Sequence, residues 1–315
     1  MLLKIMTGNF YFSWYQYFPR KTTTTLQFLS PLIWRSAKLK KFDIILTNSA
    51  YGLCSIATLG YANVLHYIHS LPKNLFGLEE KTIFQRRLPF FIQKYLYIKS
   101  LKSSKNVIAN SQYTKNILKK IVHVDSAVIY PPIEIPQPPS NKKRGEFFLI
   151  VSRIDETKNL EVAVTAFKLL DLPLKIVGAA RSPKYLQKLK ALTGKKTEFL
   201  GYLNEKEKNN LYADALALIS CKKDEDFGIA AVEAMTYGVP VIAFHGGGLK
   251  ETIENGKTGL FFYKSSPQAL IQTLKIFQKS KFDPLILYKH AQQFSSKEFK
   301  KNILKYLKAS FNLSF

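Results

Sequence analysis

Apolar and polar positions form two kinds of segment that alternate along the C-terminal half of the chain. Short apolar runs have the length of buried strands, and the stretches between them have helical periodicity. Strands are expected at 147–151, 174–177, 197–200, 216–220 and 239–244. Because strand, helix and strand follow one another as βαβ units, this half is predicted to be α/β, with a doubly wound parallel sheet.

The same alternation is weaker in the N-terminal half. Strands are expected at 42–47, 63–69, 106–110 and 127–130. A long basic helical stretch is expected from about Lys81 to Lys102, and Ser111 fits the N-cap of a helix that runs to about Val122. Residues 1–40 have little periodicity, so no element is assigned there.

A proline-rich segment, 131–145, separates the two halves and has the composition of a linker. The last residues form an amphipathic helical stretch with Phe299, Ile303, Tyr306 and Leu307 on one face. The expected organisation is an N-terminal domain at 1–135, a linker at 136–145, a second domain at 146–293 and a C-terminal helix at 294–315 that packs back on the first domain.

The bulk composition is that of a globular protein with two domains. The chain has 315 residues and 46% hydrophobic content, which suffices for two cores. Its two cysteines, Cys54 and Cys221, lack metal-ligand spacing and indicate a reduced intracellular protein. No apolar run approaches the ~18 residues of a membrane span, and the aromatic start lacks the features of a signal peptide, so we expect a cytoplasmic protein.

The net charge of +25 is unevenly distributed. Residues 1–144 hold 21 Lys and Arg against 5 Asp and Glu, whereas residues 145–315 hold 26 against 17. One interpretation is that the basic half contacts anionic lipid at the inner face of a membrane. The alternative is a lysine-rich composition with solvated faces. No nucleic-acid-binding motif accompanies the charge, so no nucleic-acid partner is expected.

The most informative stretch joins the strand at 216–220 to the helix that follows. It includes two carboxylates, Glu225 and Glu233. The free amides of Phe227, Gly228 and Ile229 at the helix start would face an anion such as a diphosphate. Carboxylates do not favour a phosphate, so they would accept hydrogen bonds from sugar or ribose hydroxyls. The alternative is that both only complement the helix macrodipole.

Several short segments together resemble a known family. They are Val151-Ser152-Arg153 with Lys158, Phe199 to Leu203, Glu225 to Gly228 with Glu233-Ala234-Met235, and Gly247-Gly248 with Glu251-Thr252. In this order and spacing they resemble the nucleotide-sugar-binding domain of GT4-type retaining glycosyltransferases, which have the GT-B architecture of two Rossmann-like domains. The N-terminal half resembles the family more loosely, at 63–72, 107–111 and 128–132.

The resemblance implies a role for each matched residue. Glu225 would contact the transferred sugar and Glu233 the ribose hydroxyls, while Arg153 and Lys158 would neutralise the diphosphate. His69 matches a family histidine that faces the sugar. The alternative for Arg153 and Lys158 is a surface cation pair at a helix start. The alternative for His69 is a histidine with ordinary hydrogen-bond partners at a strand end.

Two further sequence features, a glycine run and an Asp-x-Asp sequence, bear on ligand and metal binding. Gly247 and Gly248 follow the strand at 239–244, where glycines let the backbone approach a ligand closely; the alternative is an ordinary tight turn. Asp224 and Asp226 spell Asp-x-Asp, which holds Mg²⁺ or Mn²⁺ in another glycosyltransferase fold. The resemblance is to a metal-independent architecture, so no metal and no cofactor are expected.

The implied activity is transfer of a hexose, with mannose from GDP-mannose favoured over a UDP-sugar, to a cell-envelope glycan or lipid-linked acceptor. Family members usually open with a strand, a glycine-rich loop and a helix that this chain lacks, so the N-terminal domain is expected to be incomplete. Two other functions stay open. One is a sugar-nucleotide epimerase of the same architecture, and the other is a partner subunit that binds nucleotide sugar without transferring it.

Overall fold

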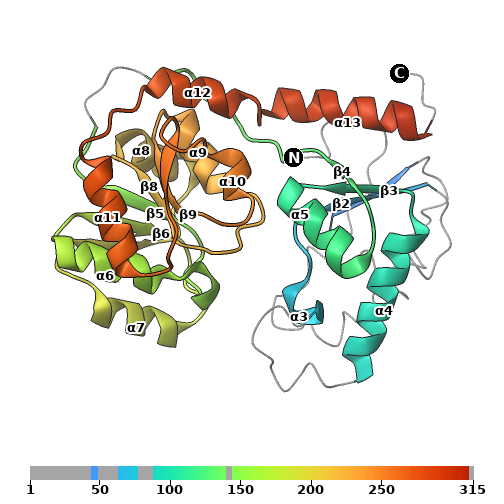
Figure 1. The fold of residues 1–315 in the computed structure, drawn as a ribbon, viewed down its shortest axis with the longest axis horizontal. Coiled ribbons are helices and arrows are strands. Elements are labelled where there is room, and N and C mark those ends of the chain that lie inside the picture. Colours follow the sequence, from blue (N-terminus) through green and yellow to red (C-terminus); the bar gives the residue numbers. More distant parts are fainter. Residues whose placement is uncertain (1–43, 49–62, 77–87, 140–143, 312–315) are drawn as a thin grey trace. The chain divides into compact units, whose positions relative to one another are not determined.

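The computed structural model describes residues 44–48, 63–76, 88–139 and 144–311. The chain divides into two compact units, one formed by Met1–Ile129 with Lys300–Phe315 and the other by Tyr130–Phe299. Each has its own parallel sheet (Figure 1). The expected start of the basic helix at Lys81, residues 42 and 43 of the first expected strand, and the last residues of the C-terminal segment lie outside the described residues.

The second unit is built on a sheet of six parallel strands in the order β10-β9-β8-β5-β6-β7. The strands are β5 (Phe148–Val151), β6 (Leu174–Val177), β7 (Thr197–Gly201), β8 (Leu218–Ser220), β9 (Val241–Phe244) and β10 (Gly259–Phe262). The predicted doubly wound sheet is confirmed. Strand β10 was not predicted, because its apolar run is short and begins with a glycine.

Helices cover both faces of this sheet (Figure 1). They are α6 (Leu160–Leu170), α7 (Pro183–Leu192), α8 (Glu205–Asp214), α9 (Ile229–Thr236), α10 (Leu249–Thr252), α11 (Pro267–Phe277) and α12 (Pro284–Gln292). Side chains of α6, α7 and α11 fill one core layer, and side chains of α8, α9 and α12 fill the other. Both faces of the inner strands are therefore largely buried, which explains their mainly apolar sequences, whereas the edge strand β7 is only partly buried.

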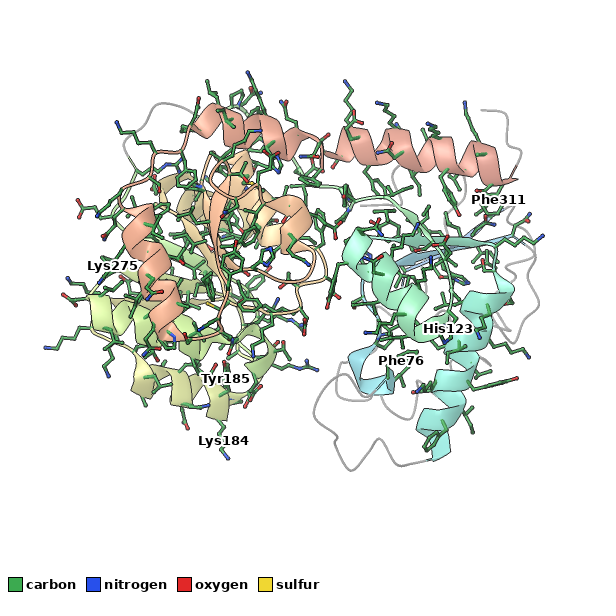
Figure 2. The ribbon with its side chains drawn as sticks, in the orientation of Figure 1. Phe76, His123, Lys184, Tyr185, Lys275 and Phe311 are labelled. Carbon is green, nitrogen blue, oxygen red and sulfur yellow. The ribbon has the colours of Figure 1, made fainter. Side chains whose placement is uncertain are left out.

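Local sequence fixes the ends of these helices. Ser182 caps α7 and a proline follows it, and Ser266 begins α11 in the same way. Asn204 and Glu207 form a capping box at α8. Burial determines which face of α7 packs against the sheet, because Tyr185 lies in the core while its neighbour Lys184 points away from it (Figure 2).

The first unit contains a smaller parallel sheet in the order β1-β2-β3-β4. Its elements are β1 (Ile45–Thr47), β2 (Val64–Ile68), α3 (Lys73–Phe76), α4 (Leu88–Ser103), β3 (Asn106–Ala109), α5 (Gln112–Ile117), a π-helical turn η6 (Leu118–Val122) and β4 (Ala127–Val128). Ser111 caps α5 as predicted, since its side chain accepts a hydrogen bond from the Thr114 amide. The helix changes to π geometry at Leu118 and ends before His123, which has φ of 58°.

The last helix, α13 (Ser296–Phe311), follows the predicted amphipathic pattern. Phe299, Ile303 and Leu307 are buried, and Tyr306 is half-buried. By contacts, residues up to Phe299 group with the second unit and those from Lys300 with the first.

Candidate functional site

The second unit has a topological switch point between β5 and β8. From β5 the chain adds β6 and β7 on one side, and β8 then pairs with β5 on its other side. Loops that follow these two strands diverge at the carboxyl edge of the sheet, which is where ligands bind in such folds. Arg153 and Lys158 follow β5, and Lys222 and Glu225 follow β8.

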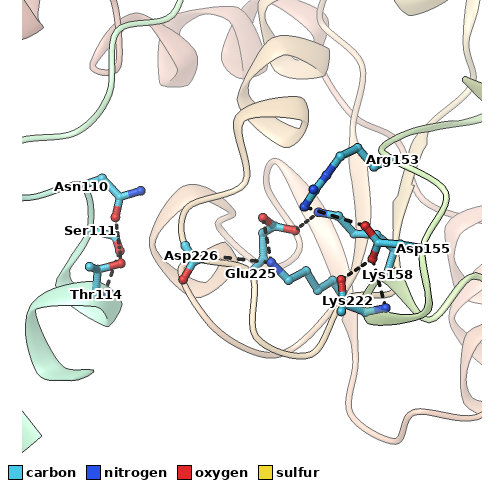
Figure 3. Close-up of polar contacts among 10 residues, drawn as sticks. Asn110, Ser111, Thr114, Arg153, Asp155, Lys158, Lys222, Glu225 and Asp226 are labelled. Atoms are coloured by element: carbon cyan, nitrogen blue, oxygen red, sulfur yellow. Dashed lines mark hydrogen bonds and ion pairs between the residues drawn. The ribbon is translucent and has the colours of Figure 1, made fainter. Parts of the chain in front are cut away.

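The carboxylate of Glu225 lies between two lysines (Figure 3). Lys158 Nζ is 2.9 Å from its Oε2 atom, and Lys222 Nζ is 3.4 Å from its Oε1 atom. Burial raises the pKa of Glu225, but the two ammonium groups outweigh it, so the net pKa lies below the ordinary value for a glutamate. Glu225 is therefore ionised at neutral pH. The structure joins two predicted site residues that are 67 positions apart in the sequence.

Asp155 organises the two cations that follow β5. It caps the 3-10 turn η7 (Glu156–Lys158), where its Oδ1 atom accepts a 3.1 Å hydrogen bond from the Thr157 amide. Its Oδ2 atom lies 3.8 Å from the Arg153 guanidinium (Figure 3). The Asp155 side chain is buried, whereas that of Arg153 is 65% exposed. Arg153 therefore keeps most of its donors available to a ligand.

The glycine run after β9 packs against the loop that carries Glu225. The Gly248 amide donates a 2.6 Å hydrogen bond to the Glu225 carbonyl. A Cβ atom on Gly247 would lie 2.2 Å from that carbonyl oxygen, and one on Gly248 would lie 2.5 Å from the Asp226 carbonyl oxygen. The close approach that requires glycine is thus to the neighbouring loop. The predicted contact of Gly247 and Gly248 with a ligand stays a prediction.

Substituting Gly247 with alanine should destabilise this loop strongly. Gly247 has φ of 59°, so the substitution adds backbone strain of about 1–2 kcal/mol to the steric clash. The matched control is Gly256→Ala, because Gly256 has φ of 79° but open space around the added Cβ. We expect chemical denaturation to show a larger loss in unfolding free energy for Gly247→Ala than for the control. Equal losses would contradict the close packing of the two loops.

Glu233, on α9, is held by α8. Tyr212 donates a 2.8 Å hydrogen bond to its Oε2 atom, and Lys208 Nζ lies 3.3 Å from its Oε1 atom. Burial and the Glu233 charge raise the pKa of Tyr212 well above its ordinary value, so the phenol stays protonated as a donor. Each carboxylate oxygen can accept a further hydrogen bond. Glu233 therefore retains capacity for ribose hydroxyls, although its described contacts are separate from those of Glu225.

The residues at the start of α9 divide between packing and exposure. Phe227 is buried, with its ring centroid 5.6 Å from that of Tyr130 and 5.4 Å from that of Phe294. Its side chain belongs to the core, so only its backbone could face a ligand. Gly228 is the N-cap of α9, with φ of 95°, and Ile229 is exposed. The predicted diphosphate contacts of these residues are thus confined to main-chain amides and remain a prediction.

His69 belongs to the first unit, where it follows β2. Asn110 follows the adjacent strand β3, and its backbone amide donates a 3.0 Å hydrogen bond to the Ile68 carbonyl. Asn110, Ser111 and Thr114 form a hydrogen-bonded cluster there (Figure 3). Burial lowers the pKa of His69, so its imidazole is mostly neutral at pH 7. Its predicted position near the transferred sugar stays a prediction.

The structure adds four side chains that the sequence analysis did not select: Asp155, Lys208, Tyr212 and Lys222. Asp155 had a readable signal, because Asp two residues before Thr157 fits a capping turn. Lys208 and Tyr212 had none, since their contact with Glu233 depends on how α8 packs against α9.

The Asp-x-Asp sequence can be compared with its surroundings. Lys222 Nζ lies 3.7 Å from the Asp226 carboxylate, and the Asp224 side chain is exposed. Within the described ranges, no group of three His, Cys, Asp or Glu side chains is arranged to hold a metal ion.

The two units, each with a parallel sheet, have the α/β fold of the GT-B architecture. Residues 133–301, more than half of the chain, match the family described as glycosyl transferases group 1. Residues 10–136 match glycosyltransferase family 4. The chain belongs to the glycosyl transferases group 1 family, as the sequence motifs predicted.

Individual relatives are more distant. An uncharacterized glycosyltransferase of Methanocaldococcus jannaschii, MJ1607, is 32% identical over 131 residues, which are 40% of this chain and 34% of that protein. Human alpha-1,3/1,6-mannosyltransferase ALG2 is 26% identical over 205 residues, which are 54% of this chain and 49% of that protein. The chain spans about half, or less, of the length of these curated relatives.

Solved structures confirm the fold. Sucrose-phosphate synthase from Thermosynechococcus elongatus superposes with a TM-score of 0.76 at 21% identity, covering 95% of this chain and 81% of that one. Anabaena HepE in complex with UDP superposes with a TM-score of 0.71 at 18% identity, covering 91% and 84%. At these identities the likeness shows the fold alone.

Proposed function

We propose that the protein is a retaining glycosyltransferase that transfers a hexose from a nucleotide sugar to a cell-envelope glycan or a lipid-linked acceptor. The observation that carries this proposal is the 2.9 Å contact between Lys158 and Glu225 across the switch-point loops. It places a cation suited to a diphosphate beside a carboxylate suited to sugar hydroxyls. Membership of the glycosyl transferases group 1 family supports the same chemistry.

The proposed mechanism assigns charge stabilisation to the second unit. When the bond between the sugar and the diphosphate breaks, the bridging oxygen gains negative charge. Arg153, Lys158 and the amides at the start of α9 would stabilise that charge more in the transition state than in the ground state. Glu225 would orient the sugar through its hydroxyls. The departing diphosphate would take the proton of the acceptor hydroxyl on the same face, and no metal is assigned a role.

Mannose from GDP-mannose is the first candidate donor. The names of relatives such as human ALG2 support mannose, whereas the HepE complex with UDP supports a uridine nucleotide as the competitor. A thermal-shift panel of GDP, UDP, ADP and the corresponding sugar nucleotides tests this choice of donor. We expect one base to raise the melting temperature of the protein most. No shift in melting temperature with any of these ligands would contradict the donor site. Incubation with the sugar nucleotide alone is a separate test, because conversion of the donor without an acceptor would indicate an epimerase.

Glu233 should contribute to binding through the ribose alone. We expect Glu233→Ala to weaken nucleoside diphosphate binding by roughly 1.5–3 kcal/mol, as for hydrogen bonds to a charged group. Tyr212→Phe removes the 2.8 Å hydrogen bond that orients Glu233 and should weaken binding less. Calorimetry with a 2′,3′-dideoxynucleoside diphosphate provides the control, because this ligand lacks the hydroxyls. Equal losses for the ribose and dideoxyribose ligands would contradict the role of Glu233.

A further inference from the structure

Helix α4 carries apolar side chains on its exposed face as well as on its buried face. Tyr97 and Leu101 are fully buried in the core of the first unit. Phe91, Ile92 and Tyr95 are 62%, 49% and 63% exposed. A surface helix ordinarily has polar residues on its outer face. An exposed apolar cluster of this kind commonly marks a binding surface.

Lysines extend the same face toward the C-terminal end of the helix. With 3.6 residues per turn, Phe91, Ile92, Tyr95, Lys99 and Lys102 fall within an arc of roughly 100°. Lys99 and Lys102 are exposed, and α4 contains no Asp or Glu. These five residues are called the α4 face below.

The sequence segment that includes the α4 face contains basic residues and no acidic ones. Residues 81–124 contain ten Lys or Arg and no Asp or Glu. Protein surfaces usually carry both signs of charge, so a stretch without any carboxylate suits a partner of uniformly negative charge. Exposed aromatic residues beside lysines fit the boundary of a lipid leaflet, where rings enter the headgroup region and ammonium groups contact phosphates.

We propose that the α4 face docks the protein on a membrane surface rich in anionic lipids. The helix would lie along that surface, because its opposite face stays packed in the core through Tyr97 and Leu101. In the part of the chain that the structure describes, no helix has the length and apolarity to cross a bilayer. The inference draws on the proposed function only for its purpose, which is to bring the enzyme to a lipid-linked acceptor.

Vesicle co-sedimentation of the full chain tests the proposal without any sugar nucleotide. We expect binding to vesicles of phosphatidylcholine with phosphatidylglycerol, little binding to phosphatidylcholine alone, and loss of binding at high salt. Phe91→Gln with Tyr95→Gln should lower the partition coefficient about tenfold. Lys99→Glu with Lys102→Glu should lower it at least as much. The matched control is Leu169→Gln with Ile276→Gln, two exposed apolar residues of the second unit that should leave vesicle binding unchanged.

Three outcomes would overturn the proposal: equal binding to neutral and anionic vesicles, no binding to either, or undiminished binding by both α4 variants. Loss of a concentration-dependent dimer in the Phe91 and Tyr95 variant, with vesicle binding retained, would assign the α4 face to a second copy of the chain. If the Phe91 and Tyr95 variant fails to fold, the Lys99 and Lys102 variant still tests the proposal, since it alters only exposed charges. A protein that transfers sugar but binds no vesicle would refute this inference alone.

Discussion

Glu225→Gln should reduce sugar transfer by about 10²-fold or more while tightening the binding of free nucleoside diphosphate. The carboxylate is assigned to the sugar, so its loss weakens orientation of the donor in the transition state. In the structure the same carboxylate is ion-paired with Lys158, at 2.9 Å. A neutral amide would leave that ammonium group available to the diphosphate. The expected gain in affinity is about threefold to tenfold, equivalent to roughly 0.7–1.4 kcal/mol.

Calorimetric titration with the nucleoside diphosphate measures the gain, and a transfer assay measures the loss. The matched control is Glu161→Gln, which alters a glutamate paired with Lys188 at 3.1 Å on the surface of the second unit. A double-mutant cycle adds a stricter test, because the gain in affinity should vanish when Lys158 is also replaced by alanine. Unchanged affinity in Glu225→Gln, or a gain that persists without Lys158, would show that Glu225 and the diphosphate do not compete for Lys158.

Removal of the cations after β5 should have a comparably large effect. Lys158→Ala is expected to lower the transfer rate by about 10²–10³-fold, which is the effect of losing one group that stabilises transition-state charge. Arg153→Ala should have a smaller effect, because its side chain is mostly exposed and ion-paired only at 3.8 Å. Steady-state kinetics of each variant give the loss in kcat/KM.

Lys188→Ala is the control for both cation variants, since Lys188 is an exposed lysine of the same unit. Its kcat/KM should stay close to that of the unaltered protein. Asp155→Asn should reproduce part of the Lys158 effect, because Asp155 caps the turn that carries Lys158. Full activity in Lys158→Ala would contradict the assignment of the diphosphate to the switch point.

The inner strands of the second unit could be predicted because they are largely buried on both faces. The mainly apolar segments at 174–177 and 239–244 give β6 and β9 to within two residues. Strand β10 lacked that signal, since it begins with Gly259 and has a short apolar run. The helix from Ser111 was predicted from its cap, but its change to a π turn at Leu118 has no comparable sequence signal.

The candidate site was only partly predictable. Motif spacing selected Glu225, Glu233, Arg153 and Lys158, but spacing cannot show that Lys158 and Glu225 touch. That contact depends on β8 pairing with β5, a long-range feature of the sheet order. Lys222 was missed because it lies three residues before Glu225 in a loop without regular periodicity. The role of Gly247 was seen only in part, since the backbone it approaches is that of Glu225 itself.

A crystal structure with a bound nucleoside diphosphate tests the central claim most directly. The account predicts the diphosphate at the switch point, with Lys158 and Arg153 on its oxygens and the ribose hydroxyls on Glu233. It also predicts that Lys158 leaves Glu225, which then keeps Lys222 as its partner. A diphosphate bound elsewhere on the second unit, or one that leaves the Lys158 and Glu225 pair intact, would contradict the account.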